Sequence, residues 1–309
     1  MTTSPLTTTK TAAPPPKPPP RRTLTQTQRI WLMLTPALAV VIVLFGGGVV
    51  LAAMQSLGYL PIIGRTTITF DAYRTIFTDP LFYRSLALTI WIGVGSTAIA
   101  TVLAIICALA LRRSFWGKRF VTFIFQLNLP IPHVVGAIGI LLLFSQSGLV
   151  SRIAYAGGLI TDTSQFPALV YDNYAIGIIL QYVWKTTCFI GVILLAALQA
   201  AGDDYENVAR TLGANRWQRF RYVTLPLLTP AILSSSILVF AFTFGAFEVP
   251  FLLGSRANSA LPVLAYRRYV DDDLNSRPEA MALSIIISFL IALLILLYMR
   301  LLRSTVRND

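Results

Sequence analysis

The side chains that could do chemistry gather in one polar stretch of an otherwise apolar sequence, DDYENVARTLGANRWQRFRYVTLPLLTP, residues 203–230. Its acids come first and its arginines follow, with one glycine between two short helical patterns. The chain has a single histidine, His133, and no cluster of metal ligands or nucleophile with a base accompanies it. We therefore expect no catalytic residue, no metal site and no cofactor, and the chemistry of this stretch to be that of docking.

The first half of the stretch predicts a short capped helix. Asp203 and Glu206 have the spacing of the N-cap and N3 residues of a capping box. Gly213 is the residue best able to take the left-handed conformation that ends a helix. The face of this helix is small and apolar, and it consists of Val208, Ala209 and Leu212. Such a helix, held at a membrane surface, is suited to a groove on another protein.

The second half predicts another amphipathic helix that leads into the membrane. Asn215 can cap it, and Trp217 and Phe220 give it an apolar face interleaved with arginines. We expect Pro226 to stop this helix, and Pro230 to lie at the start of a membrane span, where its missing N–H costs least.

The elements that must hold this stretch are membrane spans. The chain of 309 residues is 55% hydrophobic and 12% charged, against roughly 25% charged residues in soluble domains. Several apolar runs reach the ~20 residues needed to cross a bilayer. The sequence predicts an all-α membrane protein with a Pro/Thr-rich tail over residues 1–29, a polar loop over 200–228 and a basic tail over 303–309. The six predicted spans cover about 30–53, 85–111, 120–144, 175–199, 229–253 and 282–302.

The net charge of +12 is distributed unevenly between the two sides of the predicted spans. The segments that share a side with both termini carry 16 basic residues and 4 acids, whereas the other side is balanced. By the positive-inside rule, both termini are cytoplasmic. Nucleic-acid binding would need a basic face on a folded domain, and none is visible. Cys107 and Cys188 both fall in apolar runs, so no disulfide is indicated.

A few residues inside the predicted spans are unusual at membrane depth. Lys185 and Glu248 are ionisable, and a charge near the bilayer centre costs roughly 2.5–3.5 kcal/mol unless it faces a partner or a cavity. Lys185 is either a structural residue, in an ion pair or bonded to backbone carbonyls, or part of a solute path. Glu248 either reaches the headgroups or belongs to that path. Pro130 and Pro132 break the third span beside His133, which is tolerated only against protein or a wet cavity.

The spacing after Gly213 resembles a known signature. Nine residues separate Gly213 from Val223, Thr224 and the pair Leu225-Pro226. This matches the second half of the EAA loop of permease subunits in binding-protein-dependent ABC importers, which is Glu-Ala-Ala, three residues, Gly, nine residues, an aliphatic residue, one residue and Leu-Pro. Asn207, Val208 and Ala209 stand at the Glu-Ala-Ala positions, and only Ala209 matches. Either Glu206 supplies the carboxylate from one residue earlier, or the partner has adjusted to Asn207.

The resemblance implies a type I ABC importer permease fold in a bacterial inner membrane. It implies three kinds of partner: a dimer of ATP-binding subunits, a second permease subunit that is homologous or identical, and an extracytoplasmic solute-binding protein. ATP would be bound by the partner, since the chain has no G-x-x-x-x-G-K-[ST] phosphate loop. The residues implied to couple to the ATPase are Asp203, Glu206, Asn207, Ala209, Leu212, Gly213, Leu225 and Pro226. A tentative solute path consists of Pro130, Pro132, His133, Lys185 and Glu248.

The solute is less constrained by the sequence. The segment FGAFEVPFLLGS, residues 244–255, resembles permeases of the spermidine/putrescine type, but Ala246 stands where those carry an acid. Lys185 would also repel a polycation, so an anion such as a phosphonate or sulfate stays open. Two other classes are alternatives. An ion-coupled secondary transporter of a small solute should show inverted halves, and a membrane-embedded enzyme should show paired acids or histidine clusters. Neither feature is visible.

Overall fold

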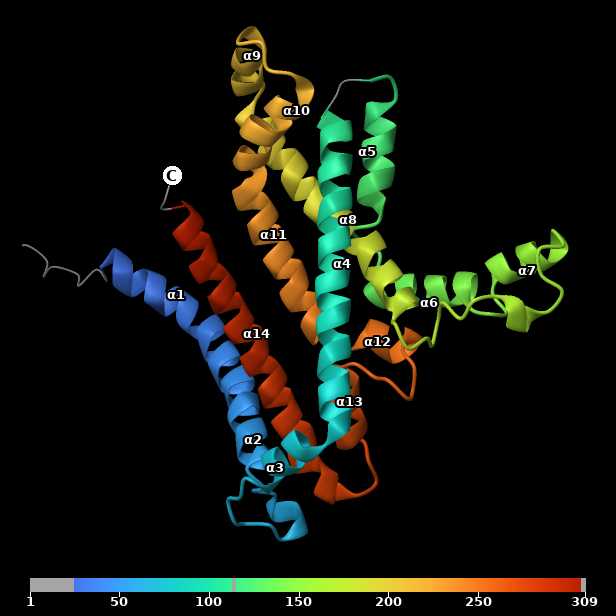
Figure 1. Ribbon diagram of the computed structural model, residues 1–309. Coiled ribbons are helices and arrows are strands. Elements are labelled where there is room, and N and C mark those ends of the chain that lie inside the picture. The colour runs from blue at the N-terminus through green and yellow to red at the C-terminus, as the bar shows by residue number, and fades with distance from the viewer. Residues whose placement is uncertain (1–24, 113–114, 307–309) are drawn as a thin grey trace, which may run out of the picture. The chain divides into compact units, whose positions relative to one another are not determined.

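The computed structural model describes residues 25–112 and 115–306, with side chains as far as Arg300, and every regular element in these ranges is a helix (Figure 1). The chain divides into two units, residues 1–50 and 51–309. Most of the predicted tail over residues 1–29 lies outside the described residues. Its last residues do not, because Thr25 and Gln28 form a capping box at the start of the first helix.

The first unit is helical throughout its described part. It contains α1 (Gln26–Val40), a π-helical turn (Val41–Gly46) and the start of α2 (Gly47–Ser56). Together these form one candidate span of 31 residues. Its most apolar window has no buried side chain within the structure, which is the surface expected of a helix that faces lipid.

The second unit contains the other five candidate spans, Pro80–Arg112, His133–Ala156, Ile176–Ala201, Arg216–Gly245 and Leu274–Arg300. The predictions of an all-α fold and of six spans are therefore confirmed. The helices of this unit after α2 are α3 (Asp71–Thr78), α4 (Pro80–Arg112), α5 (Lys118–Leu127), α6 (His133–Phe144), α7 (Leu149–Ala156), α8 (Ile176–Ala201), α9 (Asp204–Thr211), α10 (Arg216–Arg219), α11 (Leu225–Gly245), α12 (Glu248–Leu253), α13 (Leu261–Tyr269) and α14 (Arg277–Val306).

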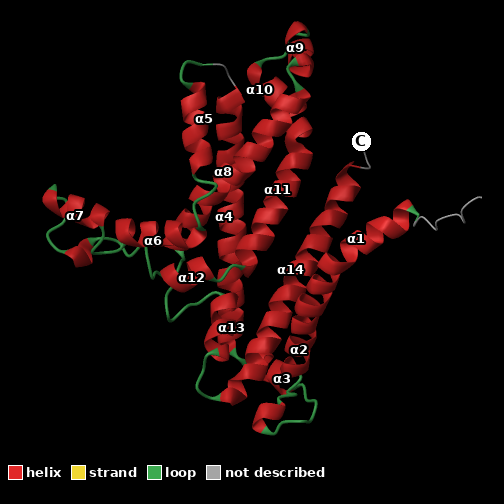
Figure 2. Ribbon diagram, turned by 180° about the vertical axis from the view of Figure 1, so that it is seen from behind, coloured by secondary structure: helices red, strands yellow, loops and turns green. Residues whose placement is uncertain are grey.

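Helices α4 and α8 form the centre of this unit. Ala100, Ala104 and Ala108 of α4 are fully buried at four-residue spacing, in one cluster with Ile190 and Leu194 of α8. Small side chains at this spacing let two helix backbones approach closely, as is common between membrane helices. Helices α6 and α7 extend sideways from this pair in both ribbon views (Figure 2). The polar end that concerns function therefore rests on a close-packed helix pair.

The third predicted span, 120–144, is not continuous. Helix α5 ends at Leu127 and α6 begins at His133, with Pro130 and Pro132 between them. Neither proline can donate a backbone hydrogen bond, so the helical ladder stops here. Helix α6 continues instead through a short break into α7, which adds the length that the third candidate span needs.

The fifth predicted span, 229–253, is shifted in the structure. One helical stretch runs from Arg216 to Gly245, and a break at Ala246 separates it from α12. The prediction that Pro226 stops the preceding helix is wrong. A π-helical turn over Phe220–Thr224 precedes α11, and Pro226 lies in the first turn of α11. A π-turn alters the hydrogen-bond ladder, and a proline in a first turn removes a donor that needs no partner.

The sixth helix, α14, begins earlier and ends later than the predicted span 282–302. It extends into the predicted basic tail as far as Val306, and residues 307–309 lie outside the described residues. At its start, Arg268 of α13 pairs with Glu279 of α14 (2.5 Å) and with Asp79 before α4 (3.0 Å). This paired arginine joins three segments at the end of the unit opposite α9.

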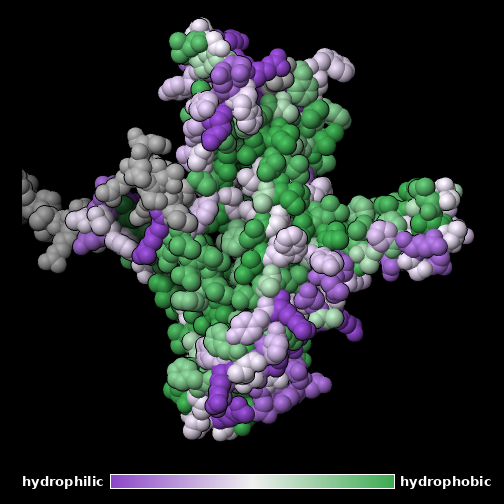
Figure 3. Space-filling view, viewed as in Figure 1, coloured by the Kyte–Doolittle hydropathy of each residue, from purple (hydrophilic) through white to green (hydrophobic). Residues whose placement is uncertain are grey.

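The surface of the second unit follows this architecture (Figure 3). Hydrophilic residues gather over α9 and α10 and over the loops at the opposite end, while the flanks of the spans between them are mostly hydrophobic. This is the distribution of a bundle whose middle lies in hydrocarbon and whose ends lie in water.

Candidate functional site

The polar stretch folds as two short helices beyond the ends of α4 and α8 (Figure 1). Gly213 ends the first of them with a φ of +83°, as the sequence predicts. The Gly213 N–H donates to the Arg210 carbonyl and the Ala214 N–H to the Ala209 carbonyl. Any other residue would meet the left-handed backbone penalty here, even though a Cβ at Gly213 would point into open space.

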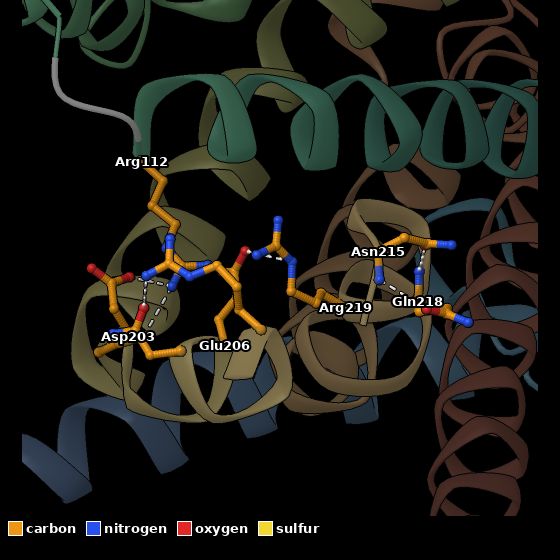
Figure 4. Close-up of polar contacts among 9 residues, drawn as sticks. Arg112, Asp203, Glu206, Asn215, Gln218 and Arg219 are labelled. Carbon is orange, nitrogen blue, oxygen red and sulfur yellow. Dashed lines mark hydrogen bonds and ion pairs between the residues drawn. The ribbon is translucent and has the colours of Figure 1, made fainter. Parts of the chain in front are cut away.

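The predicted capping box between Asp203 and Glu206 is wrong. Asp203 precedes α9, but its side chain caps no backbone N–H. Both carboxylates instead bind Arg112, the last residue of α4: Glu206 Oε2 lies 2.7 Å from Arg112 Nη1, and Asp203 Oδ1 bonds Arg112 Nη2 (Figure 4). A charge-assisted bond to a guanidinium is stronger than a bond to a neutral N–H, so the arginine takes the carboxylates.

Arg112 also donates to the Gly202 carbonyl (3.1 Å), and Glu206 Oε1 lies 3.9 Å from Arg219 Nε (Figure 4). One guanidinium thus joins the end of α4 to the linker after α8 and to α9, with α10 alongside. Arg112 is a residue that the sequence did not single out. Its only signal was a basic residue at the end of a span, which is common in such proteins.

Asn215 caps α10, as predicted, and forms a complete capping box with Gln218. The Asn215 N–H donates to Gln218 Oε1 (2.8 Å), and the Gln218 N–H donates to Asn215 Oδ1 (2.9 Å). The Asn-x-x-Gln spacing carries this signal in the sequence. The turn between α9 and α10 is therefore fixed on both sides, by a left-handed glycine and by a capping box.

Helix α9 presents an apolar face to solvent. Tyr205, Val208 and Leu212 are 66%, 59% and 82% exposed, and they lie on one side of the helix by the period of about 100° per residue. The predicted face therefore gains Tyr205, while Ala209 is half-buried. Large apolar side chains grouped at this exposure mark an interaction surface more often than an ordinary one.

The remaining predicted coupling residues lie close by. Asn207 is exposed, and its Oδ1 accepts a bond from Arg210 Nη2 (2.8 Å). Leu225 and Pro226 begin α11, just after the π-helical turn that contacts α9. The structure therefore brings the predicted coupling residues to one end of the second unit.

Lys185 lies in a second, buried polar site. It is 7% exposed, and its Nζ donates to the carbonyls of Asn128 (2.6 Å), Leu129 (3.0 Å) and Ile131. No carboxylate of the described residues lies within 4.0 Å of it. Of the alternatives left open by the sequence, the bond to backbone carbonyls is present and the ion pair is not.

The carbonyls that Lys185 binds are those left without partners where α5 ends. Two further side chains strengthen the same junction: Gln181 Nε2 donates to the His133 carbonyl (3.1 Å), and Asn128 Nδ2 donates to the Trp184 carbonyl (2.9 Å). Helix α8 therefore supports the whole break in the third span, from Asn128 to His133.

His133 begins α6 and packs against aromatic rings. Its ring centroid lies 4.8 Å from that of Phe242 and 6.2 Å from that of Tyr182. His133 Nδ1 and the Tyr182 hydroxyl are buried and have no hydrogen-bond partner among the described residues. Glu248 is exposed at the start of α12, which packs against α6 and α8. The predicted path residues thus lie on neighbouring helices.

Comparison with known proteins gives a family. Residues 100–308 match the family described as "Binding-protein-dependent transport system inner membrane component". The chain is 31% identical over 234 residues to the molybdenum transport system permease protein ModB of Mycobacterium tuberculosis, covering 74% of this chain and 83% of ModB. It is 28% identical over 198 residues to the trehalose transport system permease protein SugA of the same species, covering 63% of this chain and 62% of SugA.

The fold is similar to that of solved transporters. One is a bacterial ABC transporter involved in the import of the acidic polysaccharide alginate, with a TM-score of 0.76 and 20% identity over 89% of this chain and 95% of that one. A bacterial alginate ABC transporter in complex with an alginate pentasaccharide-bound periplasmic protein gives a TM-score of 0.73 and 20% identity, over 87% and 92%.

Proposed function

Because the chain belongs to the family of binding-protein-dependent transport system inner membrane components and is a permease subunit of an ABC importer, we propose that its loop around α9 couples solute passage to a separate ATPase. The observation that carries this proposal is the apolar face of α9, exposed yet held rigidly by Arg112, Gly213 and the Asn215 capping box. A docking helix must transmit force without bending, and these three devices fix it at its start, its end and its following turn.

The structure bears on how an ATPase would grip the loop. The Glu206 carboxylate is used inside the subunit, on Arg112, and the signature position holds Asn207, which is neutral and exposed. We propose that the ATPase holds α9 mainly through Tyr205, Val208 and Leu212. The alternative in which Glu206 reaches outward would require it to leave a charge-assisted bond of 2.7 Å.

The remaining assembly is proposed on the basis of the family. A dimer of ATP-binding subunits would bind ATP and hydrolyse it, so this chain would need no cofactor and would be no enzyme itself. A second permease subunit, homologous or identical, would complete the pathway. An extracytoplasmic solute-binding protein would deliver the solute, which is consistent with the periplasmic protein in the alginate transporter complex. We place the complex in a bacterial inner membrane with both termini cytoplasmic, as the charge distribution favours.

We propose a small anion as the solute. Lys185 places a positive charge near the break in the third span with no carboxylate of the described residues within 4.0 Å. The name of ModB is consistent with this choice. A polyamine would need an acid at position 246, where Ala246 is nearly buried (9% exposed), and neither relative named above is a polyamine system. A neutral sugar is the second candidate, favoured by the similarity to SugA.

Two experiments test these proposals. The chain is expressed beside its genomic neighbours and purified by a tag on the chain. We expect an ATP-binding subunit to co-purify, and assembly without one would contradict the coupling proposal. The solute class is then read from titration calorimetry of the partner solute-binding protein with molybdate, sulfate, a phosphonate, trehalose and spermidine. Binding of spermidine alone would overturn the anion proposal, and binding of trehalose alone would establish the second candidate.

A further inference from the structure

A polar cavity of about 600 Å³ lies between the end of α4, helix α9 and the start of the fifth span, Arg216–Gly245. Its charges do not balance, because it is lined by four arginines and two carboxylates, which leaves a formal charge of +2. These six residues are Arg112, Arg210, Arg216, Arg219, Asp203 and Glu206. The cavity is large enough for a phosphate group with several waters.

The excess charge belongs to two particular arginines. Arg112 takes both carboxylates, so they offer little to the others. Arg219 reaches Glu206 only at 3.9 Å, and its buried Nε has no hydrogen-bond partner among the described residues. Arg216 is exposed and has no carboxylate of the described chain within 4.0 Å. Open guanidinium donors at a cavity wall match the oxygens of a phosphate, which they can bind in a fork.

The depth of the cavity indicates where such a phosphate would come from. Two candidate spans meet at it, since one ends at Arg112 and another begins at Arg216. Leu109 and Phe220, one turn inside these spans, also line it. Trp217 packs on Phe220 with ring centroids 5.6 Å apart and is 68% exposed. Exposed tryptophan at a span end is typical of the headgroup level of a bilayer, so the cavity opens at the membrane surface.

The partner surface of α9 points elsewhere. At about 100° per residue, Tyr205, Val208 and Leu212 lie on the side of α9 opposite to Glu206 and Arg210, which line the cavity. A subunit that covers the apolar face of α9 therefore leaves the cavity to be filled from the membrane side.

We propose that this cavity binds the phosphate of an anionic phospholipid headgroup, with Arg216 and Arg219 as its ligands. The proposal rests on the proposed function only in taking this end as cytoplasmic, the side on which basic pockets between spans meet anionic lipid. A bound headgroup neutralises the excess charge and bridges the start of α10 to the end of α4. The lipid thereby stabilises the base on which α9 stands.

The test measures lipid retained by the full-length chain, purified in detergent with the subunits that co-purify. Native mass spectrometry compares phosphatidylglycerol with phosphatidylcholine on the natural chain and on Arg216→Gln/Arg219→Gln. The matched control is Arg221→Gln, an exposed arginine of the same segment that does not line the cavity. We expect preferential retention of phosphatidylglycerol in the natural chain and the control. Each arginine lost should weaken it about fivefold, the weight of one basic side chain near an anionic surface.

Several outcomes would overturn the proposal. One is equal retention of the two lipids by the natural chain, which requires no variant and so holds even if the double variant fails to insert. Another is an equal loss in Arg221→Gln, which would indicate a diffuse surface attraction. A third is unchanged lipid with loss of a co-purifying ATPase in the double variant, which would assign the cavity to a protein partner. Lipid retention needs no ATPase, so a failure here and a failure of the coupling proposal are separate results.

Discussion

Arg112 Nη1 lies 2.7 Å from Glu206 Oε2, although the two residues are separated by 94 positions in the sequence. This contact joins the end of α4 to the first turn of α9. Helix α4 packs along α8 through buried alanines, so the contact connects the docking helix to the most closely packed part of the bundle. Any movement of α9 is thereby passed to α4 directly as well as through the chain.

The first prediction concerns this ion pair. Arg112→Gln leaves both carboxylates without their partner, and we expect the interaction between Arg112 and Glu206 to be worth about 1 kcal/mol, since both side chains are partly exposed. The measurement is a double-mutant cycle with Glu206→Gln, read by thermal unfolding in detergent. A coupling energy near zero would show that the pair does not hold α9. Arg221→Gln, on the same surface, should leave the unfolding temperature unchanged.

The second prediction concerns the turn after α9. Gly213→Ala forces a side chain into a left-handed conformation, which should cost roughly 1–2 kcal/mol. Gly213→Asn should cost less, because asparagine tolerates this conformation. Gly213→Pro should abolish ATP-driven uptake while the chain still inserts into the membrane. Uptake assays and membrane fractionation measure the two effects, and retained uptake in Gly213→Pro would contradict the coupling role of the loop.

The third prediction concerns Lys185. Lys185→Met keeps the aliphatic volume but leaves three buried carbonyls without a donor, and we expect a loss of about 2 kcal/mol or more in stability. Lys185→Arg should lose less, because a donor remains. Thermal unfolding in detergent measures both variants. Equal stability of Lys185→Met and the natural chain would show that these bonds do not hold the break between α5 and α6.

The fourth prediction concerns the opposite end of the second unit. Arg268→Gln removes two ion pairs with half-buried partners, to Asp79 and Glu279, and should lower stability by about 1 kcal/mol. Coupling to an ATPase should be unaffected, since α9 lies at the other end of the bundle. Loss of ATPase co-purification together with normal stability would show that Arg268 acts beyond its local contacts.

Local chemistry carried part of this architecture in the sequence. Gly213 and Asn215 were predictable because a left-handed turn and a helix cap depend on residues a few positions apart. The apolar runs were equally clear, since each is longer than any buried helix of a small soluble domain needs. The break at Pro130 and Pro132 followed from two missing donors.

Long-range contacts were not predictable in the same way. Asp203 and Glu206 have capping-box spacing, but a guanidinium 91 and 94 positions earlier takes both carboxylates. Nothing near these acids in the sequence indicates that Arg112 arrives there. Pro226 likewise read as a helix stop, because a π-turn that accommodates it leaves no mark in residue spacing.

The central claim, that α9 transmits force from an ATPase through its apolar face, is tested most directly by one matched pair of variants. Leu212 in α9 and Leu159 beyond α7 are both 82% exposed, so an aspartate at either position disturbs folding equally little. The measurement is solute-stimulated ATP hydrolysis by the complex in proteoliposomes. We predict that Leu212→Asp reduces stimulation at least tenfold while Leu159→Asp retains it. Equal stimulation in the two variants would contradict the account.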